Sequence, residues 1–216
     1  MHSALRDDRG FSLTELMVVA TLLVVVMGAA WTAFLSLQAS ADSIQARAAA
    51  QDESQRFMSR ITSELRQARN PAVFEAGTVP NIGVFANVGA RSVTFYADLD
   101  RNGLPERINY RVPTGTSSLV RTQAVPTNST YPYSFGTTST PLVMIQTVDP
   151  GWAGAIFEYF SPPLSTTTSI NPVAQSNIPS MTIVSIAVKN RQKSGTRTVN
   201  YLSESSARIR SIGNGY

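Results

Sequence analysis

A long run without charge dominates the start of the chain and limits what the chain can fold into. No side chain in residues 16–41 is charged, and residues 16–37 (LMVVATLLVVVMGAAWTAFLSL) are almost wholly apolar. A helix of about 22 residues extends about 33 Å, enough to cross the hydrocarbon layer of a bilayer. The run is longer than the apolar core of a signal peptide, so we expect the mature protein to keep it as a membrane span.

The charges beside this run predict its orientation. Arg6 and Arg9 precede it, and the first charge after it is Asp42. Basic flanks stay in the cytoplasm during membrane insertion. We therefore expect a single-pass protein of the cytoplasmic membrane, with its amino terminus inside and most of the chain outside.

The helix is predicted to continue beyond the span. Residues 40–69 contain neither Pro nor Gly and are rich in Ala, Gln, Arg and Glu, which favour helix. Asn70 and Pro71 then end it, since a residue before Pro avoids the helical region. One-sided apolar spacing indicates that this half packs under a sheet. The apolar residues concerned are Ile44, Ala48, Phe57, Met58, Ile61, Leu65 and Ala68.

After residue 71 the apolar period changes from 3.6 to 2, which is typical of strands. Alternation is clearest in residues 93–97 and 108–112, with residues 98–104 as a hairpin loop between them. No helices alternate with the strands, so the predicted class is α+β, a long helix packed on a mainly antiparallel β-sheet domain. Further strands are expected at residues 83–86, 119–122, 142–147, 155–160, 182–188 and 197–202, and loops at 113–118, 126–141 and 161–179.

Residues 9–16 (RGFSLTEL) resemble the processing site of type IV prepilins and pseudopilins. In that family a short hydrophilic leader ends in Gly, followed by Phe, by Glu four residues later, and by an apolar helix. The resemblance implies the type IV pilin fold. It also implies that a prepilin peptidase cuts between Gly10 and Phe11 and methylates the new amine of Phe11. The predicted parts are then a cleaved cytoplasmic leader (1–10), a membrane and filament-core helix (11–38), an amphipathic helix (39–70) and an extracytoplasmic β-rich domain (71–216).

Glu15 stands at the start of the apolar helix, where a carboxylate costs up to about 3 kcal/mol in lipid. Cleavage would create a cationic partner, the amine of Phe11, one helical turn away on the same face. In the family the equivalent Glu pairs with the terminal amine of a neighbouring subunit and sets the register of assembly. The alternative is an interfacial Glu that reaches the water of the headgroup layer.

Residues 55–57, 64–65 and 93–108 (VTFYADLDRNGLPERI) are similar to one branch of the family. That branch contains the J-type minor pseudopilins of type II secretion and the W-type minor pilins. The resemblance implies a structural minor subunit that acts in assembly, priming or at the tip of a type IV pilus or a secretion pseudopilus. Its implied partners are other pilins, the prepilin peptidase, an inner-membrane assembly platform and membrane lipid, and its destination is a cell-surface or periplasmic filament. A major pilin stays open as an alternative.

Catalysis finds no support in the sequence. There is no cysteine, the one histidine (His2) lies in the leader, and no nucleophile-elbow, P-loop or zinc-protease motif occurs. We expect no enzyme. A second function stays open, a DNA-binding tip pilin of a DNA-uptake filament, because basic residues near the carboxy terminus can attract phosphates. These are Lys189, Arg191, Lys193, Arg197, Arg208 and Arg210.

One loop carries a metal-binding pattern. Asp98, Asp100, Asn102 and Gly103 occupy the oxygen-ligand and glycine positions of a D-x-[DN]-x-[DN]-G calcium loop, and Glu106 offers another carboxylate. The twelfth position, where a bidentate Glu is expected, is Asn109. The alternatives are therefore a calcium site and a plain hairpin turn, in which Asp and Asn bond to backbone amides. We expect no other cofactor.

Overall fold

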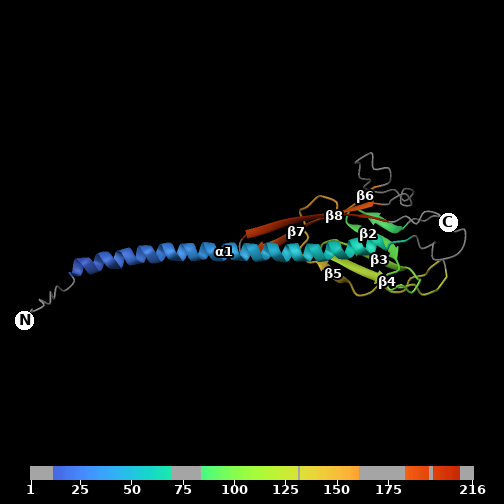
Figure 1. Cartoon of the computed structure of the whole chain (residues 1–216), viewed down its shortest axis with the longest axis horizontal. Coiled ribbons are helices and arrows are strands. Elements are labelled where there is room, and N and C mark those ends of the chain that lie inside the picture. The colour runs from blue at the N-terminus through green and yellow to red at the C-terminus, as the bar shows by residue number, and fades with distance from the viewer. Residues whose placement is uncertain (1–11, 70–83, 131, 161–182, 195–196, 210–216) are drawn as a thin grey trace, which may run out of the picture. The chain divides into compact units, whose positions relative to one another are not determined.

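The structure is a computed structural model that describes residues 12–69, 84–130, 132–160, 183–194 and 197–209 (Figure 1). Contacts along the chain divide it into two compact units, Met1–Gln45 and Ala46–Tyr216. The predicted strand at 83–86 lies partly outside the described residues, as does the predicted loop at 161–179.

Helix α1 (Leu13–Arg66) begins in the first unit and ends in the second. It agrees with the helix predicted for residues 12–69. The described chain leaves the helix through a tighter last turn, in which the amides of Gln67 and Ala68 donate to the carbonyls of Glu64 and Leu65. Gly28 lies inside the helix, which continues through it without a break. A Cβ at this position would meet no atom within 4 Å.

The buried stripe of α1 is shorter than predicted. Ile44 and Ala48 are exposed, and burial begins at Ala50. The prediction at Ile44 was wrong because this residue precedes the unit whose sheets form the core. The predicted residues from Phe57 onward are buried as expected: Phe57, Met58, Ile61, Leu65 and Ala68.

Two antiparallel sheets complete the second unit, and every described strand pairing is antiparallel (Figure 1). The first sheet has the order β1-β2-β3-β4-β5, with β1 (Phe85–Gly89), β2 (Ser92–Ala97), β3 (Glu106–Arg111), β4 (Leu119–Ala124) and β5 (Leu142–Ile145). The second has the order β6-β7-β8, with β6 (Phe157–Phe160), β7 (Ile183–Ser194) and β8 (Arg197–Arg208). The α+β class with a long helix on antiparallel sheets is confirmed.

Strands β7 and β8 are twelve residues long, which is longer than predicted. Their register runs without a break from the pair Ile183 and Arg208 to the pair Ser194 and Arg197. The prediction stopped at residue 188 because the apolar alternation stops there. The backbone ladder continues with polar residues, since cross-strand hydrogen bonds do not require apolar side chains.

The core lies where α1 covers one face of the first sheet. Along β3 burial alternates, so Ile108 and Tyr110 face inward. The ring of Tyr110 lies 5.9 Å from that of Phe57 on α1 and 6.3 Å from that of Phe95 on β2, measured between centroids. Tyr159 of β6 joins the same core, and its hydroxyl donates to the carbonyl of Ser92 at 3.1 Å.

A charged network is buried inside this core. Glu64 of α1 and Arg121 of β4 are 6% and 5% exposed, and their Oε1 and Nε atoms are 3.0 Å apart. The hydroxyl of Tyr110 donates to Glu64 Oε2 at 2.7 Å. Burial raises the pKa of Tyr110, and the charge of Glu64 adds to this effect. Burial alone would lower the pKa of Arg121, but its hydrogen bond and charge attraction to Glu64 outweigh burial and raise it.

Candidate functional site

The predicted cleavage residues Gly10 and Phe11 lie outside the described residues, which begin at Ser12. Glu15 is in the first turn of α1, and its Oε2 accepts a hydrogen bond from the backbone amide of Ser12 at 3.3 Å. Ser12 and Glu15 thus have the S-x-x-E spacing of a capping box, in which a Glu in the first turn bonds to the amide of the capping residue. This signal was present in the sequence and was overlooked.

Glu15 is exposed and lies among exposed apolar side chains. Within the part of the chain that the structure describes, no basic side chain forms an ion pair with it. One of its oxygens caps the helix at the Ser12 amide. A carboxylate in this position has spare acceptor capacity for an ammonium group at the helix start.

Residues 16–37 of the first unit form an apolar helix surface that no other described residue covers. Leu16, Leu23, Trp31 and Phe34 are each more than half exposed. Hydroxyl groups within this stretch bond to the preceding turn, as where Thr32 Oγ1 donates to the carbonyl of Ala29 at 2.8 Å. Such bonds satisfy the hydroxyls without water, as an apolar environment requires. Among the described residues α1 is the one helix long and apolar enough to cross a membrane.

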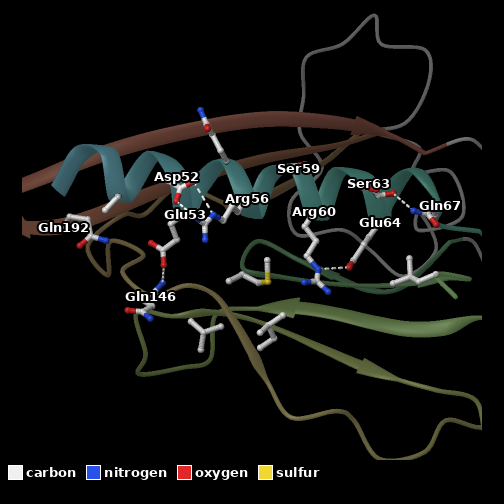
Figure 2. Close-up of a pocket in the computed structure, with 16 residues that line it drawn as sticks. Asp52, Glu53, Arg56, Ser59, Arg60, Ser63, Glu64, Gln67, Gln146 and Gln192 are labelled. Carbon is white, nitrogen blue, oxygen red and sulfur yellow. Dashed lines mark hydrogen bonds and ion pairs between the residues drawn. The ribbon is translucent and has the colours of Figure 1, made fainter. Parts of the chain in front are cut away.

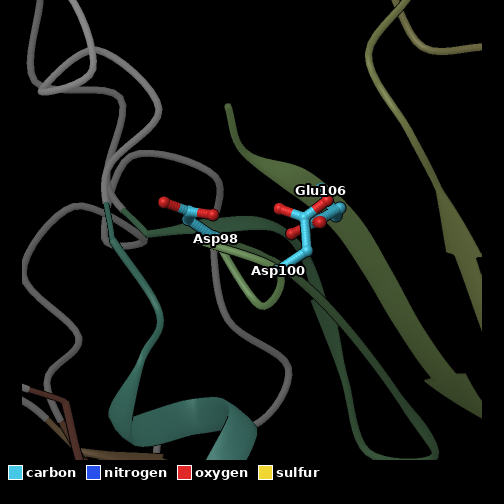
Figure 3. Close-up of side chains that lie close together, drawn as sticks. All are labelled: Asp98, Asp100 and Glu106. Carbon is cyan, nitrogen blue, oxygen red and sulfur yellow. The ribbon is translucent and has the colours of Figure 1, made fainter. Parts of the chain in front are cut away.

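Three of the predicted metal ligands come together in the loop between β2 and β3. Asp98, Asp100 and Glu106 each place a carboxylate oxygen within 4.8 Å of the others (Figure 3). Asp98 and Asp100 follow β2, whereas Glu106 is the first residue of β3, so the hairpin itself positions the group. The fourth predicted ligand, Asn102, uses its oxygen locally and accepts the amide of Leu104 at 2.7 Å.

The loop also has the hydrogen bonds of a tight turn. The amide of Gly103 donates to Asp98 Oδ2, and the amide of Asn102 donates to Asp100 Oδ1, both at 3.1 Å. Gly103 has a φ of 85° and Arg101 a φ of 60°. Positive φ suits the glycine and is uncommon for arginine. These features match the plain-turn alternative. Asp98 Oδ1 has no hydrogen-bond donor among the described atoms and is left for a cation, whereas both oxygens of Asp100 accept hydrogen bonds from Asn102.

Burial and a neighbouring charge disfavour the ionised form of Glu106 in this group. Glu106 is only 2% exposed, and burial raises its pKa, with the neighbouring charge of Asp100 adding to the shift. The amide of Leu99 partly offsets this by donating to Glu106 Oε2 at 2.8 Å. Asp98 Oδ1 is buried and has no hydrogen-bond partner among the described atoms. Carboxylate oxygens arranged in this way suit a hard divalent cation such as Ca²⁺.

A groove of about 1290 Å³ runs between the second half of α1 and strand β5 (Figure 2). Its arginines are paired along the helix, Arg56 with Asp52 and Arg60 with Glu64. Glu53 links α1 to the end of β5 across one part of the groove, because its Oε1 accepts the amide of Gln146 at 2.7 Å (Figure 2). Three carboxylates, those of Asp52, Glu53 and Glu64, therefore face two arginines in this groove, so neither arginine lacks a partner.

The basic residues near the carboxy terminus do not form one free patch. Lys189 and Arg191 lie on β7 beside Asp149, with shortest distances of 3.1 and 3.9 Å. The hydrogen bond from Lys189 lowers the pKa of Asp149. Lys193 and Arg208 are exposed, the side chain of Arg197 is not described, and Arg210 lies outside the described residues.

Comparison with known proteins gives one match. Residues 5–31 match the family model for the prokaryotic N-terminal methylation motif. No curated protein and no solved structure gives a significant match to the chain. The matched residues include the predicted cleavage site and Glu15, and the match supports a type IV pilin or pseudopilin that a prepilin peptidase processes. The apolar helix fits a single-pass membrane anchor for such a protein.

Proposed function

We propose that the chain is a structural minor pilin or pseudopilin subunit that enters a filament through α1. The observation that carries this proposal is the change along one helix, from apolar and exposed to one-sided and buried. The first part of this helix lies within the matched methylation motif. A surface that is apolar all round needs a bilayer or other helices to cover it. Lipid covers this surface while the precursor is held in the membrane, and the helices of other subunits cover it once the protein has entered a filament.

In this proposal the peptidase cuts between Gly10 and Phe11 and methylates Phe11. The test is mass spectrometry of filament-associated protein, which should start at Phe11 and carry one added methyl group. Gly10→Val should block cleavage, because a branched side chain would crowd the scissile bond. Gly28→Val is the matched control for cleavage, since it makes the same substitution inside α1, away from the scissile bond. An intact Met1 in assembled material would overturn the proposal.

Glu15 has the assembly role, in which its carboxylate receives the terminal amine of a neighbouring subunit. Glu15→Ala should leave membrane insertion unchanged, because the segment becomes more apolar, yet reduce incorporation into filaments. Glu15→Asp keeps the charge and should retain part of the incorporation. Normal incorporation of the alanine variant, measured by quantifying the subunit in sheared filaments, would remove Glu15 from the assembly step.

The finer role we propose is that of a low-abundance subunit that primes assembly or lies at the tip, as the J-type and W-type resemblance implies. Deleting the gene should then reduce the number of filaments without shortening those that form. The DNA-uptake alternative has less support, because Asp149 already pairs with Lys189 and Arg191. Salt-dependent retention of double-stranded DNA that Lys193→Gln and Arg208→Gln weaken would favour the alternative instead.

We also propose that the loop between β2 and β3 binds calcium through Asp98, Asp100 and Glu106. The buried, unpartnered oxygen of Asp98 and the closely spaced carboxylates favour this role over a turn alone. For a weak extracellular-type site, with Kd of about 0.1–1 mM, 10 mM calcium adds about 1.4–2.7 kcal/mol of stability. That corresponds to an increase in melting temperature of roughly 3–10 °C.

The calcium proposal is tested by calorimetry of the mature protein in calcium and in chelator. Asp98→Asn should abolish the difference between the two conditions. Glu204→Gln removes a carboxylate from an exposed position on β8 and should leave the difference unchanged. Equal melting temperatures of the native protein in both conditions would show that the loop is a plain turn that does not bind calcium.

A further inference from the structure

A second concave site lies on the first sheet and is separate from the groove beside α1. It is a trough of about 470 Å³, a size within the range of small-ligand pockets. Residues of β1, β2, β3 and β4 form its floor, and two residues that precede β5 form a wall. The lining residues are Ala86, Asn87, Thr94, Arg107, Asn109, Arg111, Thr122, Thr138 and Pro141.

The trough is on the sheet face that α1 does not cover. Side chains along a strand alternate between the two faces. On β3, Ile108 and Tyr110 enter the core, so Arg107, Asn109 and Arg111 belong to the opposite face. Strand β3 is the central strand of its sheet, with β2 on one side and β4 on the other (Figure 1).

The wall of the trough is held in place by an extension of the β4–β5 hairpin. The amide of Ser139 donates to the carbonyl of Gln123 at 2.7 Å, and Ser139 Oγ accepts the Gln123 amide at 3.0 Å. Further out, Phe135 lies against the sheet, with its ring 5.6 Å from that of Tyr96 and 5.0 Å from the Arg107 guanidinium. The described walls of the trough are therefore preformed.

The charge in this trough is uncompensated. No described carboxylate forms an ion pair with Arg107 or Arg111, and none lines the trough. In the groove beside α1, by contrast, both arginines have a carboxylate partner. The remaining polar lining is neutral amide and hydroxyl, from Asn and Thr side chains. Guanidinium groups bind carboxylates through paired hydrogen bonds, while amides and hydroxyls suit hydroxyl-bearing ligands.

We propose that this trough binds an acidic saccharide, a short stretch of a uronic-acid polymer. Arg107 and Arg111 are four residues apart on one strand, so their Cα atoms are separated by about 13 Å. The two guanidiniums thus receive the carboxylates of two sugar units. Asn87, Thr122 and Thr138 bond the ring hydroxyls between them.

The observations favour a saccharide over a nucleic acid. Single-stranded nucleic acid is bound by a basic track together with aromatic faces on which bases stack. Here the basic groups among the lining residues are limited to two, and no aromatic residue is among them. The ring of Phe135, which Arg107 covers on one side, packs beside Tyr96. A double helix would not enter a trough of this size.

The test is titration calorimetry of the mature protein in micelles of a detergent without a sugar headgroup. The probe is tetragalacturonate, and its fully methyl-esterified form is the uncharged control. We expect the acid to bind and the ester to bind at least about tenfold more weakly, as loss of charge-assisted hydrogen bonds implies. No binding of the acid at millimolar concentration, or equal binding of acid and ester, would overturn the proposal.

Variants locate the site. Arg111→Gln is the cleaner substitution, since Arg111 is exposed and has no ring contact among the described residues, and it should weaken binding about tenfold. Lys193→Gln removes the same charge from β7 and should leave affinity unchanged. Equal weakening by both substitutions would indicate attraction to the net charge alone. Tighter binding of a single-stranded oligonucleotide or of an acidic peptide than of the saccharide would assign the trough to that ligand class and overturn ours.

Discussion

The two halves of α1 share one backbone geometry but differ in burial: the first half is exposed, and the second half packs into a core. Leu23 in the first half is 54% exposed, whereas Phe57 and Leu65 in the second half are fully buried. Polar groups differ in the same way. Thr32 in the first half donates to the carbonyl of Ala29 on its own helix, while Glu64 in the second half accepts from Arg121 of β4. Helix propensity therefore forms α1 along its whole length. The surroundings of each half, and not its backbone geometry, determine what that half does.

The largest effect is expected from the buried carboxylate of the second half. Glu64→Ala should lower the free energy of unfolding by about 3–5 kcal/mol, because Arg121 would be left buried without its partner. The measurement is urea unfolding of the mature protein in micelles. Glu64→Gln keeps the shape and should lie between the native protein and the alanine variant. Glu15→Ala, in the first half, should leave the unfolding of the β-rich unit unchanged, and an equal loss in both variants would break the comparison.

Truncating an apolar side chain should lower stability in the second half of α1 but not in the first half. Leu65→Ala should cost about 2–5 kcal/mol, since it opens a cavity in the core cluster. Leu23→Ala removes the same atoms from a surface that the protein does not cover, so unfolding of the β-rich unit should not change. Its effect should appear in membrane retention or filament incorporation instead. A large loss of stability from Leu23→Ala would show that the first half also supports the fold.

Much of the fold could be predicted from the sequence, because the helix and the strands have different apolar periods and Pro71 separates the two regions. The extent of β7 and β8 could not, since their outer residues are polar and are held by backbone pairing across twelve positions. The buried pair of Glu64 and Arg121 was also missed. Glu64 falls on the same helix face as Ile61 and Phe57, which was a signal, but its partner on β4 is 57 residues away.

Whether a candidate site could be predicted also depends on how close its residues lie in the sequence. The carboxylates of Asp98, Asp100 and Glu106 could be predicted to lie together, because a short hairpin connects them. The trough around Arg107 and Arg111 could not, since four strands and a hairpin extension far apart in the sequence build it. Local sequence therefore predicts sites made by one turn, and misses those made by packing.

The pH dependence of stability should belong to the second unit. Burial raises the folded pKa of Glu106 above its ordinary value of 4.5. Between the unfolded and folded pKa the native state binds more protons, so stability falls as pH rises through this window. Glu106→Gln should remove that part of the fall in thermal unfolding profiles. In calcium the fall should shrink, because a bound cation favours the ionised carboxylate, and an unchanged profile would contradict the calcium proposal.

The smallest effect is expected from a surface ion pair of the second half, which separates helix stabilisation from tertiary packing. Asp52 and Arg56 pair at i,i+4 with side chains that are 58% and 77% exposed. A double-mutant cycle with Asp52→Ala and Arg56→Ala should give a coupling of only about 0.3–0.5 kcal/mol, which 1 M salt should remove. The same cycle on Glu64 and Arg121 should give a larger coupling that salt reduces little, because both groups are buried. Equal couplings in the two cycles would mean that burial in the core adds nothing to a charged pair on this helix. A much larger loss from Arg56→Ala alone than from Asp52→Ala alone would indicate that Arg56 has a partner beyond Asp52, and the groove that both residues line would then be the place to search for it.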